Sequence, residues 1–167
     1  RKGFNKDGLK NLQHLEKHAI TYSSEISIHE VLNLYRETWG PRNPGIQPEH
    51  YARLEQACNS AAKTGKIYLL NAQNAHGLLA AAIFLKNARY LHYICAAPNA
   101  AGQDMGIMHG ILDQAIRAHA GNKMQLDLEG SDIQSVQRFY KKFGPVNEPY
   151  YQIRINRLPW FIKWLRK

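Results

Sequence analysis

Cysteine, long apolar runs and acidic residues are all scarce in this sequence. Its two cysteines, Cys58 and Cys95, are too few and too isolated for a disulfide scaffold or a cysteine-based metal site. No apolar run approaches the roughly 20 residues that span a bilayer, and no secretory signal stands at the start. We therefore expect a domain of the reducing cytoplasm.

The shortage of acidic residues leaves the chain strongly basic. The sequence has 13 Asp and Glu against 22 Lys and Arg, which gives a net charge of +9. Such a surface attracts polyanions such as nucleic acid, anionic lipid or a phosphorylated cofactor. The charge is spread along the chain, so a generally basic surface explains it equally well, and charge alone names no partner.

What the chain does contain is enough apolar sequence for one packed domain. It is 44% hydrophobic over 167 residues, a composition typical of globular proteins. Apolar periodicity and turn residues predict strands at residues 19–23, 66–72, 78–86, 90–96, 124–129 and 150–155, and helices at 27–39, 49–63, 105–119 and 131–143. This order predicts a mixed α/β fold with an antiparallel meander followed by a crossover.

Residues 124–144 are the most informative segment. The predicted strand places Asp127 and Glu129 on one side, and Ser131 stands at capping-box spacing before a helix that carries Tyr140. Gly144 ends that helix. These residues predict an acid/base site, in which the carboxylates take a proton from an amine and Tyr140 donates one. The alternative is structural: the carboxylates cap the helix or pair with an arginine, and the tyrosine packs on the sheet.

The segment before the helix at 105–119 has the composition of an anion-binding turn. Gly102, Gln103 and Gly106 stand where a helix is predicted to begin, and free backbone N–H groups at such a place favour phosphate. An ordinary strand-to-helix loop is the alternative.

Several other candidates have weaker patterns. His14 and His18 lie four residues apart on a predicted helix but have no third ligand, so we expect no metal. His92 alternates along its strand as a core or edge histidine, and Cys95 has no base placed beside it. The tail at 158–167 mixes aromatic and basic residues, which is typical of a docked terminal helix and also fits a membrane surface.

Three motifs together resemble those of the GNAT acyltransferase superfamily, most closely the GNAT-like half of Fem-type peptidoglycan aminoacyltransferases. Residues 103–106 (Gln-Asp-Met-Gly) are similar to the superfamily's pyrophosphate loop. Residues 140–144 (Tyr-Lys-Lys-Phe-Gly) are similar to its Tyr-x-x-x-Gly helix end, and 127–131 (Asp-Leu-Glu-Gly-Ser) resemble the Fem-type pattern. The chain departs from the family at Met108, where the loop prefers a small residue, and at Pro145.

The resemblance implies a GNAT-like sheet and a set of cofactor contacts. Acetyl-CoA or another acyl-CoA would be the cofactor, with Tyr140 as acid toward its sulfur and the loop at 39–48 as a wall of the acceptor site. By the same resemblance, Glu129 and Asp127 belong to the catalytic set. The cofactor-binding residues would be Ile94, Cys95 and Ala96 along the pantetheine arm, and Gln103, Asp104, Met105 and Gly106 at the pyrophosphate.

Three functions follow from the resemblance. The first is an N-acyltransferase that moves an acyl group, such as acetyl, from acyl-CoA to a primary amine of a small molecule or peptide. The second is a Fem-like aminoacyl transferase that uses charged tRNA to modify a bacterial cell-wall peptide, and the third is a non-catalytic binding module. We expect a basic helical lead-in or linker at 1–18, a GNAT-like acyltransferase domain at 19–157 and an aromatic and basic tail at 158–167. A missing N-terminal GNAT-like half and a homodimer are further expectations.

Overall fold

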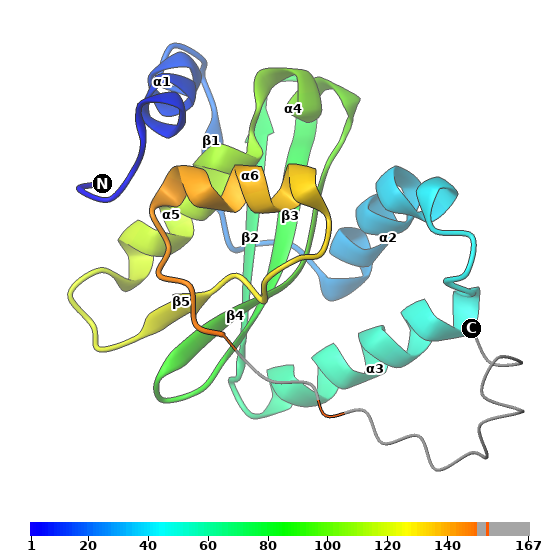
Figure 1. Ribbon diagram of the computed structural model, residues 1–167. Coiled ribbons are helices and arrows are strands. Elements are labelled where there is room, and N and C mark those ends of the chain that lie inside the picture. Colours follow the sequence, from blue (N-terminus) through cyan, green and yellow to red (C-terminus); the bar gives the residue numbers. More distant parts are fainter. Residues whose placement is uncertain (150–152, 154–167) are drawn as a thin grey trace, which may run out of the picture.

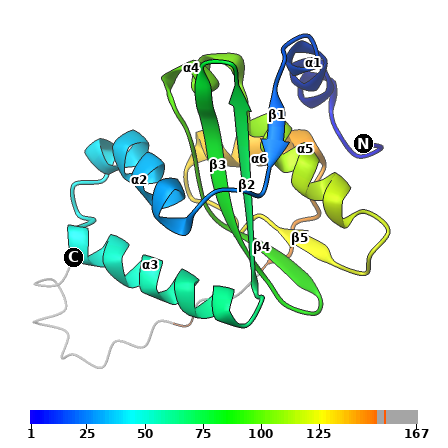
Figure 2. The same ribbon diagram turned by 180° about the vertical axis from the view of Figure 1, so that it is seen from behind.

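A five-stranded sheet forms the middle layer of the molecule, with helices on both faces (Figures 1 and 2). The computed structural model describes residues 1–149 and 153. Helices α2 (Ile28–Trp39) and α3 (Pro48–Lys63) cover one face, α5 (Met108–His119) and α6 (Gln134–Tyr140) cover the other, and α1 (Lys6–Leu15) packs beside α5. The predicted mixed α/β class is confirmed.

The strands follow the chain across the sheet in the order β1-β2-β3-β4-β5. They are β1 (Thr21–Ser23), β2 (Ile67–Asn74), β3 (Gly77–Lys86), β4 (Tyr90–Pro98) and β5 (Gln125–Asp127). The first four pair antiparallel, as short hairpin turns allow, and β5 returns parallel to β4 through the crossover helix α5. Each predicted strand within the described residues lies within two residues of its expected ends. The predicted strand at 150–155 and the tail at 158–167 lie outside them, apart from Ile153.

Strand β4 separates from β5 partway along its length. The two strands pair only at Tyr90, Leu91 and His92, so within the described part of the chain no strand pairs with residues 93–98 on that side. On its other side β4 carries a bulge, because Cys95 pairs with Ile83 while Tyr93 pairs with the next residue, Phe84. Ile94 is the extra residue, and 37% of its surface is exposed. A bulge of this kind increases the local twist and re-aims side chains.

Helix α2 begins as the sequence predicts. The Ser27 hydroxyl accepts a hydrogen bond from the Glu30 amide, and the Glu30 carboxylate accepts one from the Ser27 amide. This reciprocal capping box satisfies two amides at the helix start. The helix continues into a 3-10 turn, η1 (Gly40–Arg42), before the proline-rich loop that leads to α3.

The segment between β4 and α5 is helical, and here the sequence-based expectation of a loop is wrong. A short helix, α4 (Ala100–Met105), begins directly after the strand, with the Asn99 side chain accepting from the Gly102 amide. Gly106 then adopts the left-handed conformation, with φ 67°, and α5 follows two residues later. Asparagine is a strong N-cap, and it starts a helix that apolar periodicity alone did not reveal.

The last described helix begins later than predicted. Ser131 was expected as the N-cap, but its hydroxyl accepts from the Ile133 amide in a local turn, and α6 starts only at Gln134. Serine side chains form such turns as readily as caps, so the spacing alone did not decide. A 3-10 turn, η2 (Lys141–Phe143), follows, and Gly144 ends it in the left-handed conformation as predicted.

Two apolar clusters hold the layers together. One lies between the sheet and α1 and α5 and includes Leu12, Leu15, Phe84, Ile111 and Phe143. The other joins α2 and α3 to the opposite face, mainly through Val31, Leu32, Cys58, Ile83 and Cys95. Helix α1 therefore contributes to the main core. No helix among the described residues is long and apolar enough to cross a membrane.

Candidate active site

His92, Asp127 and Glu129 come together where β4 and β5 begin to separate. His92 and Asp127 are register partners, the last pair between the two strands. The His92 Nδ1 atom lies 2.7 Å from Glu129 Oε1 and 3.4 Å from Asp127 Oδ2. Glu129 lies two residues after Asp127, the last residue of β5, and its side chain turns toward His92. The two predicted carboxylates are thus adjacent, and they share an imidazole that the sequence assigned to the core or the sheet edge.

The backbone is specialised at Glu129. This residue has φ 59°, and among the described residues it is the one non-glycine with a positive φ. Such a conformation costs on the order of 1 kcal/mol or more and persists only where other contacts fix it. Here the Glu129 amide donates to Asp127 Oδ1 at 2.8 Å, which closes the turn and directs the Glu129 side chain toward His92.

The contacts of His92 assign its tautomer. Its Nδ1 faces the carboxylates and so carries the proton, while Nε2 faces the Asn87 amide nitrogen at 3.4 Å and carries a lone pair. An imidazole held in this way by a carboxylate can accept a proton at Nε2. The three side chains also present ligand atoms within 4.8 Å of one another, a separation that a metal ion can bridge.

Three tyrosines approach the same region from three elements. The rings of Tyr93 on β4 and Tyr140 on α6 lie edge to face, with centroids 6.2 Å apart. Burial raises the pKa of the Tyr140 hydroxyl, and the nearby Tyr35 of α2 and the Glu129 carboxylate raise it further. Burial, followed by the neighbouring Tyr140, Cys95 and Tyr35, raises the pKa of Tyr93 well above its usual value. These hydroxyls stay protonated at neutral pH and can donate a proton.

The residues predicted along the pantetheine arm lie on the unpaired part of β4. Ile94 is the exposed bulge residue, whereas Cys95 is buried, and burial raises the pKa of its thiol to about 12. A thiol of this kind is a poor nucleophile. The Ala96 carbonyl accepts from Trp39 Nε1 at 3.2 Å, and the Pro98 carbonyl accepts from Thr38 Oγ1 at 2.9 Å. Helix α2 thus already occupies two acceptors of this stretch.

The segment at 103–106 differs from an anion-binding turn. The Gln103 amide donates to the Asn99 carbonyl at 2.8 Å, and the Gly106 amide to the Gln103 carbonyl at 3.0 Å. The amides that follow, of Ile107, His109 and Gly110, are also paired within the chain. Gln103, Asp104 and Met105 belong to α4 itself. The free N–H groups expected at Gln103 and Gly106 are therefore absent from this described segment.

Sequence reasoning missed three members of the site: His92, Tyr35 and Tyr93. Each shows only an ordinary apolar or alternating pattern in its own segment. The one usable signal for His92 was the register of a parallel pair, which no turn fixes and which spacing alone does not reveal.

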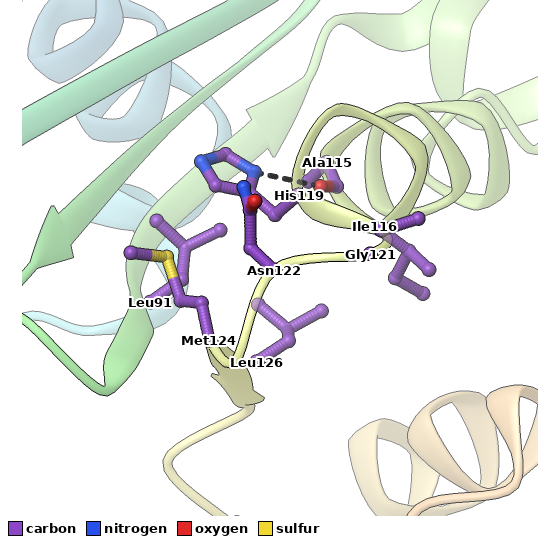
Figure 3. Close-up of a pocket in the computed structure, with 9 residues that line it drawn as sticks. Leu91, Ala115, Ile116, His119, Gly121, Asn122, Met124 and Leu126 are labelled. Carbon is purple, nitrogen blue, oxygen red and sulfur yellow. Dashed lines mark hydrogen bonds between the residues drawn. The ribbon is translucent and has the colours of Figure 1, made fainter.

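A cavity of about 170 Å³ lies between α5, β4 and the start of β5 (Figure 3). Leu91, Met124 and Leu126 line it, and the His119 imidazole closes one side with its Nδ1 bonded to the Ala115 carbonyl. Successive side chains of a strand face opposite sides of a sheet. The cavity therefore lies on the face opposite to His92 and Asp127 and is separate from the candidate active site.

Known structures share this architecture, although the sequence itself matches none closely. No protein-family model matches the chain, and no curated protein is similar to it in sequence. A predicted acetyltransferase from Clostridium acetobutylicum, crystallised with acetyl-CoA, has a TM-score of 0.58 at 15% identity, covering 82% of this chain and 96% of its own. A GNAT-family acetyltransferase from Streptococcus pneumoniae has a TM-score of 0.56 at 17% identity, covering 84% and 98%.

FemX has a TM-score of 0.67 at 10% identity, covering 86% of this chain and 54% of its own. The chain therefore spans about half the length of FemX. These similarities define the class: the chain has the GNAT fold, as its motifs predicted. Within that fold its structural neighbours include both acetyltransferases and FemX, which confirms the Fem-like resemblance at the level of architecture.

Proposed function

We propose that the chain is an N-acyltransferase that moves an acyl group to a primary amine where β5 leaves β4. One observation carries the proposal: an imidazole held by a carboxylate, the His92–Glu129 pair, lies next to the separation of the two strands, with Tyr140 close by. The GNAT fold supports acyl transfer as the reaction class.

In the proposed reaction the amine attacks the acyl carbon directly. His92 Nε2 accepts the amine proton after the amine displaces the 3.4 Å contact from the Asn87 amide nitrogen, while Glu129 holds Nδ1–H and stabilises the imidazolium that forms. A bond forms between nitrogen and the acyl carbon, the bond from that carbon to the leaving atom breaks, and the Tyr140 hydroxyl gives its proton to the leaving atom. Asp127 acts by holding the turn at Glu129. Catalysis otherwise depends on positioning the two reactants.

Acyl-CoA is the donor that the fold implies, and the described residues do not fit its pyrophosphate. The amides of Gln103, Gly106, Ile107, His109 and Gly110 already pair within the chain, and two carbonyls of β4 accept from side chains of α2. We therefore propose acetyl-CoA or another acyl-CoA only as a donor to be tested, and we assign no step to it.

A Fem-like donor, aminoacyl-tRNA, is the second candidate, and the paired amides favour it. Its ester needs no pyrophosphate cradle, and the net charge of +9 suits a nucleic acid. The similarity to FemX supports the same choice. On this proposal the acceptor is a peptide amine of a cell-wall precursor, and a further domain completes the acceptor groove.

The test is a transfer assay with both donors and a panel of amines. Radiolabelled acetyl-CoA and charged tRNA are offered separately to the wild type, to Glu129→Gln and to Tyr140→Phe, with Glu55→Gln on α3 as a matched control. We expect acylated amine from one donor, a strong loss in the two site variants and none in the control. Binding of a donor without transfer from either would make the chain a binding module and end the proposal.

A further inference from the structure

A second cavity, of about 340 Å³ and open to solvent, lies between α1 and η2. Its lining side chains are Asp7, Lys10, Asn11, His14 and Lys142. Four of the five can donate a hydrogen bond, and only Asp7 is acidic. The first four come from α1 and the last from the end of the α6–η2 segment, so the cavity exists only because the N-terminal helix docks there.

That docking is rigid. The Asn5 amide donates to the Lys142 carbonyl at 2.9 Å, and the rings of Phe4 and Phe143 meet edge to face at 5.1 Å. Helix α1 approaches so closely that a Cβ on Gly8 would lie 2.8 Å from the Lys142 carbonyl oxygen. These contacts place the backbones of Lys10 and Lys142 on opposite walls of the cavity.

The cations of this cavity are free to bind a ligand. Within residues 1–149, neither the Lys10 nor the Lys142 ammonium lies within 4.0 Å of a carboxylate. Arg1, on the same N-terminal segment, is by contrast committed to Asp113 and Glu16. The Asn11 amide already donates to the Asp7 carbonyl at 2.7 Å, so the two ammonium groups and the His14 imidazole are the donors that match a phosphate, which offers only acceptors; the Asp7 carboxylate opposes it.

We propose that this cavity binds a phosphate group of an RNA strand. The choice of RNA rests on the aminoacyl-tRNA donor of the proposed function. The cavity also adjoins the turn at Gly106, since Asn11 Oδ1 lies 3.4 Å from where a Cβ on Gly106 would stand. The phosphate site is thus built from side chains of α1 and η2 beside a turn whose own amides are paired.

The experiment measures tRNA binding to the full chain by fluorescence anisotropy over a range of salt. We expect the double variant Lys10→Gln/Lys142→Gln to weaken binding at least tenfold and to reduce the salt slope by about 1, because one phosphate contact contributes about 0.7 to 1. The matched control is Lys63→Gln/Lys66→Gln, two exposed lysines at the end of α3 and the start of β2. Its effect should be slight.

A substitution at Asp7 should strengthen tRNA binding, opposite to the effect of the lysine substitutions. Asp7→Asn removes the one acidic group from the cavity, so it should tighten tRNA binding a few-fold and leave the fold intact. This variant keeps the test decisive even if the double variant loses stability. Equal effects of the cavity and control variants, or weaker binding by Asp7→Asn, would overturn the proposal.

Competition separates the sources of phosphate. CoA and inorganic phosphate, each at millimolar concentration, should displace tRNA poorly; full displacement by CoA at low concentration would assign the cavity to a CoA phosphate instead. The readout also distinguishes this proposal from the proposed function. Unchanged tRNA binding in the double variant would contradict the phosphate site and leave the proposed function standing. Intact tRNA binding without any acyl transfer would contradict the proposed function and leave the phosphate site standing.

Discussion

The imidazole of His92 and the carboxylate of Glu129 are joined by a 2.7 Å contact across the last pair of β4 and β5. Glu129 reaches His92 from a left-handed backbone conformation, and the Asp127 side chain holds that conformation. In the proposed reaction, Glu129 and Asp127 therefore act through the histidine.

The first prediction separates the proton acceptor from the groups that position it. His92→Gln should lower kcat of acyl transfer by about 10²- to 10⁴-fold, the usual contribution of a general base. Glu129→Gln should cost less, and it should add nothing in the His92→Gln background, because Glu129 acts through His92. A double-mutant cycle on kcat measures this. Independent, multiplying losses would contradict the assignment.

Tyr140→Phe removes a single hydroxyl from the site. Because burial and the neighbouring Tyr35 and Glu129 raise its pKa, this group stays a proton donor above neutral pH. The variant should lose about 10²-fold in kcat and keep its melting temperature. Tyr68→Phe on β2, also partly buried, is the matched control and should keep full activity. A similar kcat for both variants would exclude Tyr140 as the acid.

Asp113 is expected to be essential for stability. Its carboxylate, 3% exposed, accepts two hydrogen bonds from the Arg1 guanidinium at 2.9 and 2.7 Å and pairs with Arg117. Asp113→Ala removes the anion that pairs with Arg117 and two charge-assisted hydrogen bonds from Arg1, which keeps its contact with Glu16, so the free energy of unfolding should fall by about 2 kcal/mol. Urea denaturation measures it. Glu16→Gln, at the exposed partner of Arg1, should change it by less than about 1 kcal/mol.

The lowered pKa of His109 should make the free energy of unfolding depend on pH. Burial lowers the pKa of its imidazole, and the Lys142 ammonium lowers it further, against a bond to the Gly106 carbonyl. Its Nε2 is buried without a partner among the described residues. The folded protein therefore binds this proton less readily than the unfolded chain, whose histidines titrate near pH 6.5. The contribution of His109 to the free energy of unfolding is therefore fully present above about pH 6.5. It is lost as the pH falls toward the lower pKa that His109 has in the folded protein.

Unfolding in urea at pH 8, 7, 6 and 5 tests this dependence. His109→Leu should be less stable at pH 7, through loss of the bond to Gly106, and should show a flatter decline on acidification. His76→Gln, in an exposed turn, should reproduce the wild-type slope. A slope that survives in His109→Leu would assign the acid sensitivity to other groups.

The fold could be predicted from the sequence because its signals are local. The capping box at Ser27, the hairpin turns and the glycine at 144 each fix a boundary through neighbouring residues. The errors in the predicted helix boundaries arose where the same residue type is common in two different local structures. Asn99 capped an unexpected helix, and Ser131 made a turn in place of a cap.

The site was predicted only in part because its members meet through long-range register. Asp127, Glu129 and Tyr140 share one segment and were found together, but His92 joins them only because β5 stops opposite it. No pattern within residues 90–98 distinguishes a histidine at a strand's last pair from one at a solvated edge. The pairing of the Gln103 and Gly106 amides was equally hidden, since it depends on how α4 and α5 join.

The separation of β4 from β5 has a consequence for the behaviour of the protein in solution. A strand with an unpaired side invites a foreign strand to add to it, which is a route to aggregation. Trp39 and Thr38 bond two carbonyls in that stretch, so side chains of α2 stand in for the missing neighbour. The unpaired side of β4 can thus remain accessible to a reactant while these side chains prevent a strand of a second polypeptide from pairing with it. Loss of these two side chains should show first as self-association.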